Sequence, residues 1–153
     1  MQVLIRPAVA ADQPAIKAIV RAARINPMDL AWPRFLVAEA GQDIIGVGQV
    51  KPHGDGSREL ASIAVVPEWQ RQGIGGMLIK ALLARETGTL HLTCLAGMED
   101  YYRRFGFRRI ARGEMTPYFR RLDRVAHVIA LMTFNNLFRP IVMRREAYDD
   151  QRE

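Results

Sequence analysis

The sequence predicts an α/β fold of the α+β type, in which a single central mixed sheet is flanked by helices. Residues 35–40, 44–50 and 59–66 are three β-like runs separated only by turns rich in Gly, Asp and Pro, which is typical of consecutive antiparallel strands. An apolar helical pattern follows the third run and leads into another β-like run at 90–95. A strand, helix, strand order requires a parallel crossover, so we expect a mostly antiparallel sheet with one parallel pair.

The chain before these strands is expected to supply a strand and a helix. Residues 3–6 are a short β-like run, and Asp12 stands where it can cap a following helix. The apolar positions of this helix repeat at helical spacing and are Ile16, Ile19 and Val20. Asn26-Pro27 ends it, and residues 28–34 are expected to form a second, short helical piece.

The chain after the third strand predicts two helices on either side of the fourth strand. Residues 73–86 are apolar nearly all round, which is typical of a helix laid against a sheet. Residues 99–105 predict a short helix that ends at Gly106, a residue suited to the position after a helix. Residues 107–110 are expected to begin another strand.

The tail is expected to add a helical segment at about 113–138 and a closing strand at 141–143. Its apolar stretch at 125–132 is too short to span a bilayer. We interpret the segment as an extra helix packed on the domain. A homodimer interface and a cover over an acceptor site are the alternatives, because the segment has an excess of apolar residues.

The composition predicts a single cytoplasmic domain that spans residues 1–153. Hydrophobic residues make up 49% of the chain and charged residues 25%, which are ordinary values for a globular protein. Cys94 is the sole cysteine, and the histidines lack metal-ligand spacing, so we expect neither a disulfide nor a metal. No apolar run has the length of a signal-peptide core or a membrane span, so no membrane association is expected.

The net charge of +6 comes largely from arginines between Arg103 and Arg124 and at Arg144 and Arg145. Such a balance suits a polyanionic partner, either a nucleic acid or a phosphorylated cofactor. The segment lacks the interleaved aromatic residues of a nucleic-acid module, so nucleic acid is not favoured. An RNA-associated protein using residues 103–124 stays open as a weaker hypothesis.

The stretch from Val65 to Gly76 is the most informative part of the chain, because an apolar strand ends there and a long helix begins. The amides at a helix start have no intrahelical acceptor, and glycines allow a ligand to approach the backbone, so the stretch predicts an anion site. It is not a P-loop, because no Gly-Lys-Ser/Thr follows. It also lacks the spacing of a Rossmann fingerprint.

Residues 59–107 contain two sequence motifs separated by one crossover. The loop Gln70-Arg71-Gln72-Gly73-Ile74-Gly75 has the pattern Gln/Arg-x-x-Gly-x-Gly/Ala and follows Val65-Val66-Pro67-Glu68. Tyr102 to Phe107 have the pattern Tyr-x-x-x-Gly-Phe. With these motifs the chain resembles the GNAT superfamily of N-acetyltransferases. The motifs cover about a third of the chain, and the order of elements agrees with the family over nearly all of it. Residues 95–98 depart from the asparagine and alanine that the family often places there.

The resemblance implies acetyl-CoA as the acyl donor and no metal. The pantetheine arm is expected to pair, like an added strand, with the backbone of Ile63, Ala64 and Val65, where the parallel pair splays apart. The amide of Val65 is expected to polarise the thioester carbonyl. The pyrophosphate is expected at the helix start, with residues Arg71, Gln72, Gly73, Ile74, Gly75 and Gly76.

Two residues are implied as catalytic. Tyr102 matches the family tyrosine that protonates the departing thiolate, and an aromatic packed under the cofactor is its alternative role. Glu59 stands 14 residues before Gly73, where some family members place a general base. Its alternative role is a solvated surface charge. Cys94 is expected to be a core thiol, His53 a turn residue and His91 a residue on the polar side of its strand.

The sequence therefore predicts an acetyl-CoA-dependent N-acetyltransferase that transfers the acetyl group to a primary amine by direct attack in a ternary complex. The alternative is a non-catalytic module that binds acyl-CoA for regulation. The acceptor is expected to be a small molecule or a peptide, and no motif in the chain identifies it.

Overall fold

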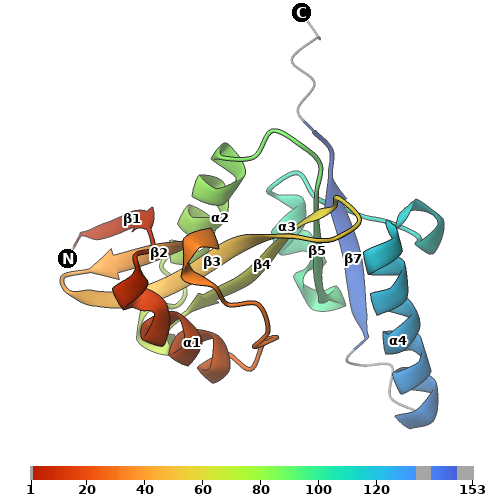
Figure 1. Ribbon diagram of the computed structural model, residues 1–153, viewed down its shortest axis with the longest axis horizontal. Coiled ribbons are helices and arrows are strands. Elements are labelled where there is room, and N and C mark those ends of the chain that lie inside the picture. The colour runs from red at the N-terminus through yellow and green to blue at the C-terminus, as the bar shows by residue number, and fades with distance from the viewer. Residues whose placement is uncertain (1, 134–138, 148–153) are drawn as a thin grey trace, which may run out of the picture. The chain divides into compact units, whose positions relative to one another are not determined.

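The computed structural model describes residues 2–133 and 139–147. The chain divides into two compact units, one comprising residues 1–51 and 60–86 (unit 1) and the other residues 52–59 and 87–153 (unit 2). Strand β4 (Arg58–Val65) begins in unit 2 and continues in unit 1. The hydrogen-bonded strand order is β1-β2-β3-β4-β5-β7-β6, which confirms the predicted mixed sheet with a parallel β4 and β5 (Figure 1).

The strands of unit 1 form an antiparallel set. Strand β1 (Val3–Pro7) pairs with β2 (Phe35–Ala40), and β2 pairs with β3 (Asp43–Pro52). Only residues 53–57 connect β3 to β4, a link that is too short for a crossover, so these neighbouring strands are also antiparallel.

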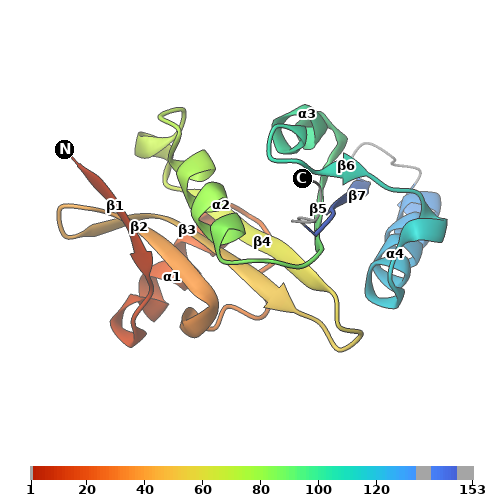
Figure 2. The same ribbon diagram turned by 90° about the horizontal axis from the view of Figure 1, so that it is seen from above.

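Two helices cover opposite faces of the strands in unit 1 (Figure 2). Helix α1 (Gln13–Ala22) buries its apolar face in a core that includes Phe35, Val37 and Val47. Helix α2 (Ile74–Ala84) packs against the face on which β3 carries glycines. A Cβ atom at Gly48 would lie 2.6 Å from Ile63 Cδ1 and 3.0 Å from Leu82 Cδ1, so a larger residue here would have to displace the ends of these side chains.

Unit 2 contains the rest of the sheet and two helices. Glu59 of β4 pairs in parallel with His91 of β5 (Leu90–Leu95), and β5 pairs antiparallel with β7 (Pro140–Arg145). The short strand β6 (Arg108–Arg109) also pairs with β7. Helix α3 (Glu99–Arg103) precedes β6, and helix α4 (Pro117–Thr133) buries Phe119 in a cluster with Ile110, Met115 and Val142.

Three local expectations are corrected. Residues 28–34 do not form a helical piece, and only Trp32–Arg34 make a 3-10 turn. The reason is that Gln13 anchors this segment from α1: its Nε2 donates to the Leu30 carbonyl at 2.6 Å and its Oε1 accepts from the Trp32 amide at 2.8 Å. The strand expected at 107–110 is limited to the two residues of β6.

Asp12 precedes α1 but does not cap it with its side chain. Its carboxylate accepts instead from the Val9 amide at 2.8 Å and from the Arg6 guanidinium at 2.8 Å, and chiefly the Arg6 bond lowers the pKa of Asp12. The helical segment expected at 113–138 is represented by α4, and residues 134–138 lie outside the described residues.

No helix within residues 2–133 and 139–147 has the length and apolar character to cross a membrane. In the same part of the chain, no group of three or more His, Cys, Asp or Glu side chains is placed to hold a metal ion.

Candidate active site

The turn between β4 and α2 is held in place from both sides. The Val66 amide donates to the Ile45 carbonyl of β3 at 2.9 Å, and the Gln70 side chain donates to the Val65 carbonyl at 2.9 Å. Arg71 and Gly73 have φ angles of 63° and 81°, in the left-handed region. Glycine adopts this conformation freely whereas arginine does so at a cost, so the surrounding hydrogen bonds must fix the turn.

Helix α2 begins with open hydrogen-bond donors. Its first helical bond runs from the Met77 amide to the Gly73 carbonyl at 3.0 Å, which leaves the amides of Ile74, Gly75 and Gly76 without intrahelical acceptors. A Cβ atom built on Gly73 would meet no atom within 4 Å, and the neighbouring Arg71 is exposed. Open space, free amides, the helix dipole and a nearby cation together fit a pyrophosphate group.

Strand β4 is distorted immediately before the residues expected to contact pantetheine. Ser62 has a φ of 58°, and its Oγ accepts a hydrogen bond from Gln49 Nε2 at 2.9 Å. Because Val66 directs its amide to β3, the alternation along an antiparallel strand directs the Val65 amide to the opposite side. The main chain of Val65 therefore faces away from β3.

Glu59 is buried, with 7% of its surface exposed. Its Oε1 lies 2.8 Å from Nε2 of His53, and the two side chains are 10% and 9% exposed. A solvated surface charge, the alternative interpretation of Glu59, is therefore wrong. A buried carboxylate requires a hydrogen-bond donor, and the His53 imidazole is that donor when Nε2 carries the proton.

The His53 ring is fixed by its neighbours in unit 2. It stacks on the Tyr118 ring of α4 at a centroid distance of 3.6 Å and meets the edge of Phe119 at 5.8 Å. Asp55 connects the same hairpin to α4, because its Oδ2 accepts from the Tyr118 amide at 2.9 Å. Burial alone would raise the pKa of Asp55, but hydrogen bonds from Ser57 and the Tyr118 amide outweigh it and lower the pKa.

His53 is the site residue that the sequence alone did not identify. It was assigned only to a turn, and nothing in its local pattern marks it. A signal was present in the six-residue separation between His53 and Glu59 across a hairpin, a spacing that can bring two side chains to one face.

His91 lies on the same face as its strand partner Glu59, and its expected place on the polar side of the strand is wrong. It is 4% exposed and stacks on Phe119 at 4.8 Å. Neither ring nitrogen has a hydrogen-bond partner in the described residues. Burial, with the charge of Arg144 as a smaller cause, lowers the pKa of His91, so its ring is neutral at pH 7.

Tyr102 lies on α3 and is partly buried. Its ring is held edge-on by Tyr101 at 5.2 Å and by Phe107 at 6.4 Å. Burial raises the pKa of Tyr102 to about 12, so the phenol stays protonated at neutral pH. No hydrogen bond to the hydroxyl is found within residues 2–133 and 139–147, which leaves its proton available for a ligand.

Cys94, on the adjacent strand β5, has the character of an inert thiol. It is half-buried, and its Sγ lies 3.8 Å from Sδ of Met143. Burial raises the pKa of Cys94 to about 11, which disfavours the thiolate that a nucleophilic role would need.

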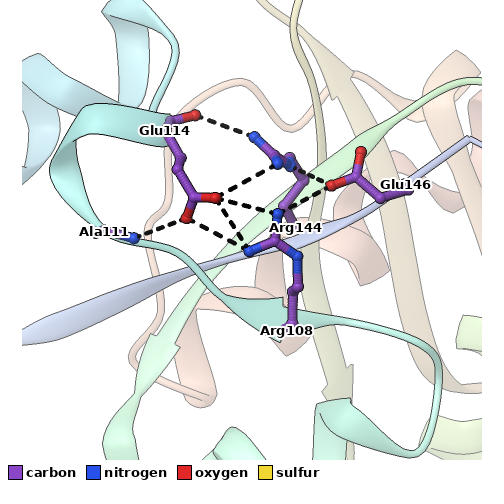
Figure 3. Close-up of polar contacts among 5 residues, drawn as sticks. All are labelled: Arg108, Ala111, Glu114, Arg144 and Glu146. Carbon is purple, nitrogen blue, oxygen red and sulfur yellow. Dashed lines mark hydrogen bonds and ion pairs between the residues drawn. The ribbon is translucent and has the colours of Figure 1, made fainter.

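Many arginines of the tail are already neutralised by carboxylates. Figure 3 shows Arg108 and Arg144 sharing Glu114 and Glu146, with Arg108 Nη2 3.2 Å from Oε1 of both and Arg144 Nε 2.7 Å from Glu146. Arg112 pairs with the buried Asp123 at 2.9 Å. Part of the positive charge in this region is therefore paired with carboxylates of the protein itself.

The site residues predicted from the sequence are divided between the two units. The loop residues 63–76 lie in unit 1, whereas Glu59 with His53, and separately Tyr102, lie in unit 2. The chemistry available is an anion cradle in one unit, and a buried carboxylate and a protonated phenol in the other.

Comparisons with known proteins identify the fold and the family of this chain. The chain resembles N-acetylglutamate synthase from Neisseria gonorrhoeae, solved with coenzyme A and N-acetyl-glutamate, at a TM-score of 0.76 and 18% identity; the match covers 97% of this chain but 36% of that one. It resembles Rv2747 from Mycobacterium tuberculosis, solved with CoA, at a TM-score of 0.70 and 23% identity; the match covers 95% of this chain and 99% of that one. It also resembles ElaA from Escherichia coli, with a TM-score of 0.69 and 13% identity; the match covers 95% of this chain and 100% of that one.

The chain thus spans about a third of the Neisseria enzyme, and at these identities the structural likenesses establish the fold. A sequence comparison with curated proteins finds no significant match. The family model described as an acetyltransferase (GNAT) domain matches residues 31–109, which is about half of the chain and includes both motifs. The chain belongs to the GNAT acetyltransferase family.

Proposed function

We propose that this protein is an acetyl-CoA-dependent N-acetyltransferase that transfers an acetyl group to a primary amine by direct attack in a ternary complex. The observation that carries the proposal is the start of α2, where the family loop motif brings together free amides, a left-handed glycine and an exposed arginine. Two of the structural relatives contain coenzyme A.

The donor would be held by unit 1. The amides of Gln72, Gly73, Ile74, Gly75 and Gly76, with the charge of Arg71, are assigned to the pyrophosphate. The backbone of Ile63, Ala64 and Val65 is assigned to the pantetheine arm, in the manner of an added strand. The Val65 amide, which faces away from β3, is assigned to the thioester carbonyl oxygen as negative charge develops on it.

The proton transfers are assigned to unit 2. The acceptor arrives as an ammonium, and Glu59, directly or through a water molecule, takes its proton so that the nitrogen lone pair can attack the thioester carbonyl. The C–N bond then forms, the C–S bond breaks, and the Tyr102 hydroxyl gives its proton to the leaving thiolate. His53 keeps the Glu59 carboxylate in one orientation through the 2.8 Å contact.

The test is a screen for release of the CoA thiol from acetyl-CoA with amino acids, polyamines, aminoglycosides and peptides that bear free amines. Amine-dependent release that falls about 100-fold or more in Glu59→Gln supports the proposal. Asp43→Asn, at the exposed first residue of β3, is the matched control and should keep full activity.

Two results would contradict the proposal. Tight CoA binding with no transfer to any amine would favour the non-catalytic acyl-CoA module instead. Full activity in Glu59→Gln would keep the acetyltransferase but remove Glu59 as the base.

A further inference from the structure

Two cationic side chains of unit 1, Lys51 on β3 and Arg34 just before β2, donate to neutral protein groups and have no carboxylate partner within the described residues. Lys51 is 5% exposed, and its Nζ donates to the Met28 carbonyl at 3.1 Å. Arg34 donates to the Asp29 carbonyl through Nη2 at 3.0 Å and to Gln49 Oε1 through Nε at 3.2 Å. Every acceptor in this cluster is neutral, although removing an ammonium from water is costly unless an anion balances it.

The cluster has unused donors. The Lys51 ammonium carries three N–H groups and makes one hydrogen bond among the described residues, and the Arg34 guanidinium carries five and makes two. Gln49, in contrast, is fully buried and uses its amide on the Asp29 carbonyl at 3.0 Å and on Ser62 Oγ at 2.9 Å. Gln49 therefore fixes the geometry, while the two cations keep capacity for an anion.

The segment over this cluster is a turn held by side chains. Asp29 has a φ of 56°, in the left-handed region, and Met28 is 66% exposed. The Met28 and Asp29 carbonyls are the groups that Lys51 and Arg34 contact. A ligand carboxylate could replace these carbonyls as the acceptor, or it could accept hydrogen bonds from the remaining N–H groups. The planar guanidinium of Arg34 matches the two oxygens of a carboxylate.

The cluster adjoins the strand that is assigned to the acyl donor. Gln49 of the cluster donates a hydrogen bond to Ser62 of β4. The next residue of β4 is Ile63, the first of the residues assigned to pantetheine. An anion bound by Arg34 and Lys51 would therefore stand beside the donor segment within unit 1. In an amine acetyltransferase, the molecule that belongs there is the acceptor.

We propose that Arg34 and Lys51 bind a carboxylate of the acceptor, so that the substrate class is a free amino acid rather than a polyamine or an aminoglycoside. This inference rests on the proposed acetyltransferase function. It assigns to the acceptor a negative charge that complements the two unbalanced cations, and it leaves the choice of side chain to other residues.

The experiment compares acceptors that differ only in charge. Glycine and glycinamide, L-glutamate and its α-amide, and L-glutamate and L-glutamine are tested in the thiol-release assay, with putrescine as a dication. We expect at least one removal of a carboxylate to lower kcat/KM by about 10- to 100-fold, the effect of one charge-assisted hydrogen bond. Equal rates for all members, or a preference for putrescine, would overturn the inference while leaving the acetyltransferase proposal intact.

Lys51→Met and Arg34→Gln should remove the preference, mainly by raising KM for the carboxylate form and leaving its amide unaffected. Lys17→Met, at an exposed position of α1, is the matched control. If these substitutions only loosened the turn, KM would rise equally for the carboxylate acceptor and for its amide. That result would contradict the carboxylate assignment.

A binding measurement keeps the test independent of turnover. Titration of L-glutamate into the wild-type protein saturated with CoA should show binding that Lys51→Met loses, with CoA affinity unchanged in the variant. If the protein proves unable to transfer an acetyl group, this titration still decides the matter, and absence of carboxylate binding overturns the inference.

Discussion

Tyr102→Phe tests the last proton transfer, because it removes one hydroxyl and little else. The Phe ring keeps the edge contacts to Tyr101 at 5.2 Å and Phe107 at 6.4 Å, and no hydrogen bond to the hydroxyl is found in the described residues. We therefore expect an unchanged melting temperature and an unchanged affinity for CoA. A positioned general acid contributes about 100-fold or more to the rate, so kcat should fall by at least that factor, about 2.7 kcal/mol.

The raised pKa gives the same prediction a second readout. With a pKa of about 12, roughly 0.1% of Tyr102 is ionised at pH 9, against about 10% for a tyrosine with the ordinary pKa near 10. The acid form is therefore retained across the assay range, and Tyr102 should cause no loss of kcat between pH 7 and 9. Steady-state thiol release over this range measures both effects. A kcat within twofold of the wild type in Tyr102→Phe would refute the general-acid role.

Three further perturbations test other parts of the structure. Gly75→Glu should abolish CoA binding in a calorimetric titration, because it places a side chain and a negative charge at the open start of α2; normal binding would refute the assigned cradle. Cys94, with a pKa of about 11, should react with iodoacetamide at pH 8 about 100-fold more slowly than an ordinary thiol, and fast labelling would show that it is not buried as described. Asp55→Asn should lower the melting temperature at pH 7: the pKa of Asp55 is depressed in the fold, so its contribution is present above pH about 4 and lost as the pH falls further. The difference between the variant and the wild type should therefore begin to shrink once the pH falls below about 4 and should vanish only below the depressed pKa of the folded state, and a difference that stays constant below pH 4 would contradict this.

The parts of the fold that the sequence predicted are those determined by local patterns. The strand, helix, strand order predicted the parallel pair, and the contiguous loop at 70–75 led to the proposal of an anion site, which stays a prediction. Helix α2 was placed within two residues at its C-terminal end because its apolar run is continuous, from 73–86 predicted to Ile74–Ala84 observed. Each of these features depends on neighbours in the chain.

The parts that were missed depend on partners distant in sequence. Residues 28–34 have helical composition, but Gln13 holds their backbone in another form through two hydrogen bonds. His91 follows the alternation of an exposed position, yet Phe119, 28 residues away, covers it. Neither contact could be inferred from local spacing, since both require the tertiary packing first.

The same reasoning explains how the tail bears on the candidate base. The tail was interpreted as an added helix, with a homodimer interface or a cover over the acceptor site as alternatives. In the structure, α4 supplies the Tyr118 ring on which His53 stacks at 3.6 Å, and His53 contacts Glu59 at 2.8 Å. The orientation of the carboxylate is thereby coupled to a helix that begins 58 residues later in the chain. An element outside the matched family segment 31–109 thus orients a side chain on β4, so variation in this tail can alter the candidate base without altering any motif residue.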